Sequence, residues 1–382
     1  QYFEFGGPNM KKLLSLALAL AMTLSLSACS PKSAAPTAAP TAAPTAAPTA
    51  APTAAPAAPV SFTDSCGRTV ELTGEITRIV PSGPLAQMVL FALAPEKFVG
   101  LSSKWSKETE DFIDAAYYNL PVLGQLYGTS AGELNLETLA AADPQLILDI
   151  GEPKKTIVED MDSITKQLGV PAVHIDAYTA TMGDTYRTLG KLLGKEEQAE
   201  KLAAYCDETY ANALTLQQKL GDKKAKVVYC LGDNGLNVLA KTSYHAEVLD
   251  LLTDNLAVVD GPSSKGTGNE SDMEQLLLWD PEVILFAPGD VYEMVGSDKT
   301  WQSLSAIQNG SYYEVPFGPY NWMGFPPSVN RYLGILWLSD LLYPAEAKID
   351  LFAEVSKYYD LFYHCKLTQA QFDSLTVNSL KK

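Results

Sequence analysis

Residues able to hold a bare metal ion are scarce in this sequence. The chain has three histidines among 382 residues, His174, His245 and His364, whereas a metal site needs three or four convergent ligands. His174 falls at the end of a predicted strand, His245 at the start of a predicted helix and His364 in a helix predicted over 345–365. His364 is expected to lie far from the other two, and a single histidine is more often structural than a metal ligand. Direct capture of a bare metal ion therefore remains only an alternative.

Catalytic motifs are equally sparse. Lys265–Asn269 contains a Gly-x-Gly pattern, but a third glycine does not follow two residues later. No Ser-His-Asp or paired-cysteine arrangement stands out in the sequence. The residues favour a binding protein without a resident cofactor, and a cell-surface enzyme is kept as the less favoured alternative.

The charge balance excludes one class of partner. The chain holds 28 Lys and Arg against 45 Asp and Glu, a formal net charge of −17. A chain this acidic is a poor binder of polyanions, so nucleic-acid binding is excluded. The hydrophobic fraction of 47% supports a real core, and the length exceeds the ~250–300 residues at which single cores stop growing. Two domains are therefore expected.

The N-terminal region has the pattern of a targeting signal. Met10 precedes two lysines and the apolar run Leu13–Leu26, followed by small residues before Cys29. The run is shorter than the roughly 20 residues that a membrane-spanning helix needs. Residues 1–28 are therefore predicted to be upstream residues and a signal peptide. The segment Leu26–Cys29 resembles the lipobox of bacterial lipoproteins, which implies a diacylated Cys29 at the mature N-terminus.

Residues 29–59 are predicted to be the lipid anchor and a linker. From Pro36 to Pro56 proline recurs every fourth residue, with alanine and threonine between. Proline at this spacing prevents a continuous helix, and the residues between offer too little apolar surface to fold. We expect a semi-rigid spacer that holds a folded body away from a membrane.

The body that follows alternates short apolar strands with helices. The first half is predicted over 60–180, and it begins with a hairpin over 60–73. Further strands are predicted at 76–80, 98–101, 146–150 and 172–175, and helices at 85–93 and 156–168. This alternation predicts an α/β fold with a parallel sheet between helices.

A long helix separates this first half from a second one. Residues 195–220 contain neither proline nor glycine and carry a helical apolar stripe. We therefore predict an interdomain segment over 181–222. The second half, 223–382, has predicted strands at 226–231, 257–259 and 283–286 and ends in helices.

The two halves share an internal repeat. Residues 135–148 read NLETLAAADPQLIL and residues 272–285 read DMEQLLLWDPEVIL. Asn135 and Asp272 suit helix N-caps, and Glu137 and Glu274 favour the positive end of a helix. In each unit Asp-Pro then stops the helix before a buried strand. The repeat indicates two related α/β lobes.

On these residues the body, from about 60 to 379, resembles the substrate-binding proteins of ABC importers. It is similar to the class with two Rossmann-like lobes joined by one long helix (class III), which binds iron–siderophores, haem and cobalamin. Many of the metal-chelate binders carry an Asp-Arg pair where this chain has Gly324-Phe325, so the arginine that would meet an anionic chelate is missing. The segments that carry the resemblance are Thr63–Arg68, Thr77–Val80, the two Asp-Pro units, Pro319–Trp322, Pro326–Ser328 and Leu342–Pro344.

The fold implies where a ligand binds. In open α/β sheets, ligands lie beyond the carboxyl ends of the strands, so the loops of two facing lobes form a cleft. Rigid aromatic side chains in these loops suit a chelate or macrocycle whose metal is already satisfied. The residues predicted to contact the ligand are Ser82, Lys104, Trp105, Tyr127 and Glu152 in the first half, and Asn234, Lys265, Tyr320, Asn321 and Trp322 in the second.

The resemblance also implies a partner. In such importers one surface glutamate on each lobe docks against arginine pockets of the membrane permease, and Glu137 and Glu274 are the matching positions. Two separated carboxylates can fix orientation through charge pairing. The sequence thus predicts a monomeric, lipid-anchored extracytoplasmic protein that captures an iron–siderophore or similar metal chelate and delivers it to an ABC permease. Cobalamin, haem, an oxyanion or a bare metal are alternative ligands.

Overall fold

The described part of the chain begins with an antiparallel hairpin. The computed structural model describes residues 60–127, 134–263 and 265–381, and the predicted signal peptide, the lipidated Cys29 and the linker lie outside them. Strand β1 (Val60–Thr63) pairs with β2 (Thr69–Leu72). The turn between them holds Gly67 at φ +76°, a left-handed conformation that glycine adopts without steric cost. The predicted hairpin is confirmed.

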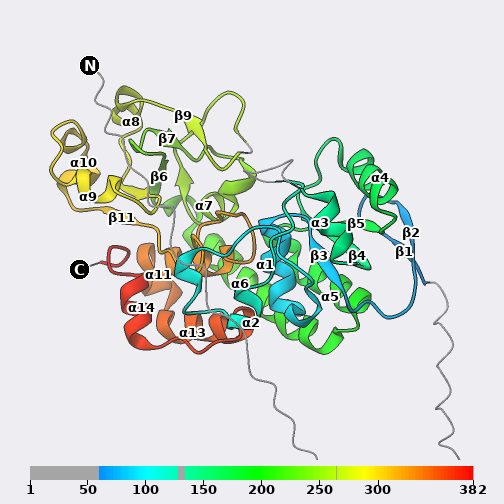
Figure 1. Ribbon diagram of the computed structural model, residues 1–382. Helices are drawn as coiled ribbons and strands as arrows, with labels where there is room; N and C mark the ends of the chain where they lie inside the picture. The colour runs from blue at the N-terminus through cyan, green and yellow to red at the C-terminus, as the bar shows by residue number, and fades with distance from the viewer. Residues whose placement is uncertain (1–59, 128–133, 264, 382) are drawn as a thin grey trace, which may run out of the picture. The chain divides into compact units, whose positions relative to one another are not determined.

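The first half is built on a parallel sheet with the order β3-β4-β5 (Figure 1). These strands are β3 (Ile79–Pro81), β4 (Leu146–Gly151) and β5 (Ala172–Asp176). Every residue of β4 is buried, as expected for a parallel strand covered on both faces. Helix α1 (Pro84–Leu93) packs on β3 and β4, and α4 (Ile157–Leu168) packs on β5. The elements predicted over 85–93, 146–150, 156–168 and 172–175 are confirmed.

Two strand predictions in this half are only partly right. The strand predicted from residue 76 begins at Ile79. The strand predicted over 98–101 is reduced to isolated bridges, Phe98 with Ile79 and Leu101 with Val122. Both bridges are parallel, so the segment still continues the direction of the sheet.

A helix of 25 residues, α6 (Glu196–Leu220), follows the first half. Gly221, at φ +52°, caps its carboxyl end, and the prediction over 195–220 is confirmed. The helix packs along α5 (Met182–Leu193) and also contacts α7 (Glu247–Leu252) and α11 (Arg331–Leu342). Because α7 and α11 belong to the second half, α6 joins the hydrophobic cores of both halves.

The second half contains a mixed sheet with the order β11-β10-β6-β7-β9 (Figure 1). Strand β6 pairs in parallel with β10 and β8, and antiparallel with β7, which pairs antiparallel with β9. The bounds are β6 (Lys226–Leu231), β7 (Asn237–Val238), β8 (Asp254–Asn255), β9 (Asn269–Glu270), β10 (Val283–Phe286) and β11 (Tyr312–Glu314).

One strand prediction here is wrong. The strand expected over 257–259 is absent from the described residues, and pairing in this region ends at Asn255. The Asn255 side-chain oxygen accepts a hydrogen bond from the backbone N–H of Ala257 at 3.1 Å. Leu256 still donates to the carbonyl of Val227 in β6 at 3.0 Å, but the N–H of Val258 donates to the carbonyl of Leu256 at 2.8 Å. This tight turn, together with the asparagine side chain, ends the pairing before a strand can form over 257–259.

The C-terminal helices pack against the rest of the core. Helix α13 (Leu351–Phe362) contacts α1, α6 and α11. The single helix predicted over 345–365 is wrong, because Lys348 takes φ +52° and Asp350 caps a new helix through the N–H of Ala353. The remaining helices are α2 (Ala115–Tyr118), α9 (Val291–Val295), α10 (Ser305–Gln308), α12 (Pro344–Ala347) and α14 (Gln369–Leu375).

The internal repeat is confirmed in structural detail. Asn135 caps α3 (Leu136–Ala141) through the N–H of Thr138 at 2.9 Å, and Asp272 caps α8 (Met273–Trp279) through the N–H of Gln275 at 2.8 Å. After each helix the aspartate of the Asp-Pro unit takes a left-handed conformation, φ +49° at residue 143 and φ +42° at residue 280. Each unit then leads into a buried parallel strand, β4 or β10. The same capped helix and left-handed aspartate therefore precede a parallel strand in each of the two sheets.

All described residues fall within one compact unit, Ala55–Lys382. No helix in the described ranges is both long and apolar enough to cross a bilayer.

Candidate ligand-binding site

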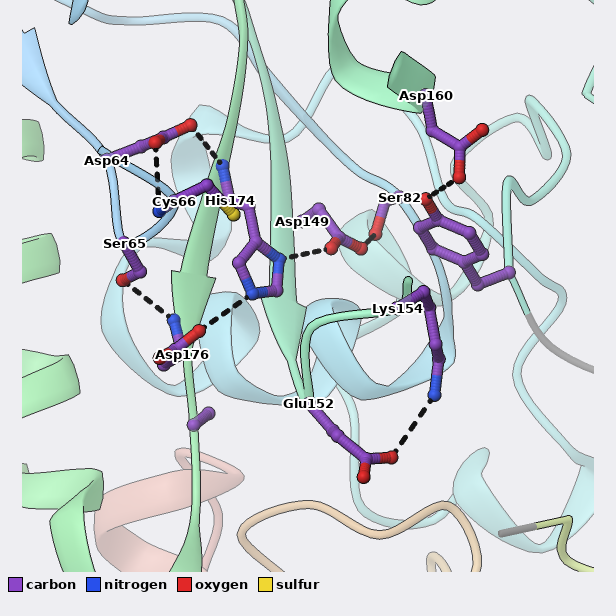
Figure 2. A network of polar contacts seen from close by, with 12 residues as sticks. Asp64, Ser65, Cys66, Ser82, Asp149, Glu152, Lys154, Asp160, His174 and Asp176 are labelled. Carbon is purple, nitrogen blue, oxygen red and sulfur yellow. Dashed lines mark hydrogen bonds and ion pairs between the residues drawn. The ribbon is translucent and has the colours of Figure 1, made fainter. Parts of the chain in front are cut away.

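A buried histidine lies between two aspartates toward the carboxyl ends of β4 and β5 (Figure 2). His174 Nδ1 is 2.6 Å from Asp149 Oδ2, and His174 Nε2 is 3.0 Å from Asp176 Oδ1. Burial alone would lower the pKa of His174, but the hydrogen bonds and charges of Asp149 and then Asp176 outweigh burial and raise it. A histidine that donates from both ring nitrogens is an imidazolium. His174 therefore ties the two strands together by charge.

Two predicted ligand contacts, Ser82 and Tyr127, have their hydroxyl groups engaged inside this half. The Ser82 hydroxyl donates to Asp149 Oδ1, and the residue is buried. The Tyr127 hydroxyl donates to Asp160 Oδ2 at 2.5 Å, and that oxygen also accepts from Thr156. Tyr127 is half-buried, so part of its ring remains accessible.

A cavity of about 480 Å³ lies where loops of the first half meet α6 and the second half. We call it the tyrosine cavity, because three tyrosines line it. Glu152, a predicted ligand contact that follows β4, is on its wall. The lining residues are Glu152, Tyr178, Thr179, Ala180, Tyr210, Gln217, Thr242, Ser243, Tyr244, Glu247, Asp250 and Leu251.

The wall of the tyrosine cavity is held by a buried arginine. Arg331 Nη1 donates to Glu247 Oε2 at 2.6 Å, and its other amino group donates to the carbonyl of Tyr244. The same Glu247 oxygen accepts from the backbone N–H and the hydroxyl of Thr179, at 3.0 and 2.5 Å. The guanidinium carbon of Arg331 lies 4.5 Å from the centroid of the Tyr244 ring. The cluster joins the start of α11, the start of α7 and the loop after β5, and so links the two halves.

A second, more polar cavity of about 320 Å³ lies within the first half. Lys104, a predicted ligand contact, lines it with an exposed side chain. The other lining residues are Ser102, Ser103, Val122, Leu123, Gly124, Gln125, Asn135 and Thr138.

Trp105 and Tyr320, predicted on opposite halves, are brought together. Their ring centroids are 6.2 Å apart, and Tyr320 is half-buried. Trp105 is only 3% exposed, because its ring packs edge-on against Phe91 and its indole N–H donates to the carbonyl of Tyr117. Tyr320 therefore has more surface to offer than Trp105.

The other two residues of the Tyr320 run are buried. The Asn321 amide donates to the hydroxyl of Tyr229 at 2.9 Å, and its oxygen accepts from the N–H of Met323. Trp322 is 0% exposed and donates from its indole N–H to the carbonyl of Gly318. Both residues act as core residues that shape the loop after β11, and neither lines the tyrosine cavity or the more polar cavity of the first half.

Asn234 and Lys265 lie on the surface of the second half. Both side chains are exposed, and Asn234 accepts a hydrogen bond from the N–H of Leu236. Neither residue is on the wall of the two cavities. Of the ten predicted contacts, the structure thus places Glu152 in the tyrosine cavity and Lys104 in the polar one.

The sequence prediction missed four residues that line the tyrosine cavity, Tyr178, Tyr210, Tyr244 and Glu247, and it also missed Arg331 behind the wall. Tyr178 directly follows β5, so the rule that ligands lie beyond strand ends would have selected it. Tyr210 lies on the long helix, where its place on an apolar stripe is typical of a core residue. The pairing of Arg331 with Glu247 has no local sequence signal, because the two residues are distant along the chain.

Glu137 and Glu274 occupy equivalent exposed positions on α3 and α8. One turn beyond them the two helices differ. The residues after Glu274 include Leu277 and Leu278, which are 43% and 78% exposed. The matching positions after Glu137 are Ala140 and Ala141, also exposed. The face next to Glu274 is therefore the more apolar.

The four cysteines in the described ranges, Cys66, Cys206, Cys230 and Cys365, are unpaired, and Cys206 and Cys230 are buried. Among the described residues, no group of three or more His, Cys, Asp or Glu is arranged to hold a metal ion.

The chain is similar to several known proteins. It is 28% identical to an ABC transporter solute binding protein from Sulfurospirillum deleyianum, with a TM-score of 0.76 over 82% of this chain and 98% of that one. It is 25% identical to a periplasmic solute binding protein from Veillonella parvula, with a TM-score of 0.69 over 85% and 98%.

A curated relative, YhfQ from Bacillus subtilis (strain 168), is provisionally named an ABC transporter substrate-binding lipoprotein. It is 26% identical over 223 residues, which are 52% of this chain and 65% of YhfQ. The chain thus matches just under two thirds of the length of this relative. The family model described as periplasmic binding protein matches residues 106–318, more than half of the chain. The chain belongs to the periplasmic binding protein family.

Proposed function

We propose that this chain is the extracytoplasmic substrate-binding lipoprotein of an ABC importer. In this proposal it captures an iron–siderophore or similar metal chelate between its two halves and delivers the chelate to the permease. The observation that carries the proposal is the tyrosine cavity, because loops from both halves and α6 contribute to its wall. Its volume of about 480 Å³ lies within the ~300–1,000 Å³ typical of small-molecule sites.

The aromatic side chains around the cavity support a chelate as the ligand. Tyr178 and Tyr244 pack edge to face, with ring centroids 5.8 Å apart, and Tyr210 adds a third ring to the wall. Aromatic rings give large apolar contact areas at low conformational cost, which suits the organic shell of a metal chelate. The half-buried rings of Tyr127 and Tyr320 are further candidates for contact with the ligand.

The chemistry of the proposed ligand is tested by identifying what the protein carries. The full-length protein is extracted from membranes of its source organism, and the bound molecule is examined by mass spectrometry and by its absorption spectrum. We expect a metal chelate in near-stoichiometric amount. A haem or cobalamin spectrum, or an oxyanion alone, would replace the chelate with one of the alternative ligands.

The anchoring is a separate part of the proposal. Cys29 would be lipidated and the 29–59 linker would space the body from the membrane, with two acyl chains giving stable attachment. A Cys29→Ser variant is expected to leave the membrane fraction while its purified body keeps the affinity of the unmodified protein. Membrane retention of that variant would contradict lipidation at this residue.

A further inference from the structure

The tyrosine cavity has an unusual charge pattern. Its wall contains the carboxylates of Glu152, Glu247 and Asp250, whereas lysine, arginine and histidine are absent from the twelve lining residues. An anionic ligand in this cavity would meet three carboxylates and no cationic side chain among the lining residues. The wall therefore favours a ligand that brings its own positive charge or hydrogen-bond donors.

The one arginine beneath the wall is not free to meet an anion. Arg331 is 2% exposed and donates to the Glu247 carboxylate and the Tyr244 carbonyl. Its charge is therefore balanced by Glu247 inside the protein. Asp250 is partly tied up as well, because its two oxygens accept from the N–H of Thr242 and the amide of Asn255. Glu152 is the carboxylate of the wall with the weakest internal partner, Lys154 at 3.4 Å, and both side chains are partly exposed.

The tyrosine rings of the cavity favour an ammonium group as the positively charged part of the ligand. The rings of Tyr178 and Tyr244 lie at 90° to each other and form an aromatic corner. The guanidinium of Arg331 already lies over the Tyr244 ring, whereas Tyr178 has no such cation among the described residues. Burial raises the pKa of the Tyr178 hydroxyl, and the charges of the carboxylates Asp176, Glu152 and Glu247 raise it further. Aromatic faces attract ammonium groups, and carboxylates beside them strengthen the attraction.

We propose that the ligand places a protonated amine in the tyrosine cavity, against the Tyr178 ring of the aromatic corner and Glu152. The inference rests on the proposed function, and it narrows the ligand class to chelates with a cationic substituent.

A matched pair of fragments tests the cation preference without any chelate. Hexylammonium and hexanoate are compared by saturation-transfer NMR on the wild-type protein at equal concentration. We expect transfer to hexylammonium at least tenfold stronger than to hexanoate. Glu152→Gln is expected to remove more than half of that signal. The control Glu159→Gln changes the same charge on an exposed residue of α4 outside the cavity, and it should leave the signal unchanged. Equal transfer to the two fragments, or equal effects of the two variants, would overturn the inference.

A matched pair of chelates separates the inference from the proposed function. Ferrioxamine B is a ferric trihydroxamate with a protonated pendant amine, and its N-acetyl derivative has the same iron shell without that charge. We expect the amine form to bind at least tenfold more tightly, and Glu152→Gln to bring the ratio close to one. Equal, tight binding of both forms would overturn the inference and support the proposed function. Binding of hexylammonium with no binding of either chelate would support the inference and count against a chelate of this kind.

Discussion

Arg331 Nη1 lies 2.6 Å from Glu247 Oε2, and this buried ion pair connects the first residue of α11 to the first residue of α7. Thr179, in the loop after β5, donates to the same carboxylate oxygen. The pair therefore links the helices of the second half to a strand end of the first, directly behind the tyrosine cavity.

Removal of Arg331 is expected to destabilise the protein strongly. Arg331→Ala leaves Glu247 partly buried without its cation, a loss that costs about 3–5 kcal/mol in comparable buried pairs. Arg187→Ala is the matched control, because Arg187 pairs with Glu200 and Asp207 at the surface, where ion pairs contribute about 0–1 kcal/mol. Urea denaturation of both variants measures the difference. If both variants lose the same free energy of unfolding, the buried Arg331–Glu247 pair stabilises the protein no more than a surface ion pair does.

The stability of the protein is expected to depend on pH through His174. The pKa of His174 is raised in the folded protein above the ordinary histidine value of 6.5, because the hydrogen bonds that Asp149 and Asp176 accept from its ring outweigh the effect of burial. The stabilisation is therefore fully present below about pH 6.5 and is lost as the pH rises through the higher folded pKa. The free energy of unfolding, measured by urea denaturation between pH 5 and pH 9, should fall over that upper window. His174→Gln should flatten this part of the curve, and parallel curves for the two proteins would refute the assignment.

The two caps of the internal repeat are expected to contribute equally. Asn135→Ala and Asp272→Ala each remove a side-chain acceptor from a helix N-terminus, which typically costs ~1 kcal/mol. Glu208→Ala is the control, because this side chain is exposed in the middle of α6, and such changes alter stability by about 0.5 kcal/mol or less. Thermal unfolding of the three variants tests the structural equivalence of α3 and α8. If only one cap variant loses stability, α3 and α8 share a backbone conformation but their caps do not contribute equally.

Permease docking is expected to need both exposed glutamates. Glu137→Ala combined with Glu274→Ala should abolish uptake in cells while the purified protein keeps its ligand affinity, since neither residue lines a cavity. The matched double variant Glu110→Ala, Glu293→Ala removes one exposed carboxylate from each half elsewhere and should transport normally. Normal uptake by the Glu137, Glu274 double variant would exclude this mode of docking.

The sequence was most informative where a local pattern decides the structure. The 25-residue helix α6, the buried strands β4 and β10 and the two caps follow from apolar runs, helix-ending glycine and capping side chains. The prediction over 257–259 failed because the Asn255 side chain and the hydrogen bond from Val258 to the carbonyl of Leu256 turn the backbone at this point.

The site was harder to predict than the fold, because burial of a loop residue depends on distant contacts. Tyr320 and Trp322 are two residues apart in the same loop, yet one is half-buried and the other is inaccessible. Similarly, Tyr244 lines the cavity with its position fixed by Arg331, which is far along the chain. The types of the neighbouring residues do not predict such contacts between distant parts of the chain.

The most direct test of the central claim is to locate the bound ligand. The protein is crystallised with the molecule that copurifies with it, and the difference electron density is examined. The proposal predicts density for a metal chelate in the tyrosine cavity, in contact with Tyr178, Tyr244 and Glu152. Density for the ligand at another place, with this cavity filled only by water, would contradict it.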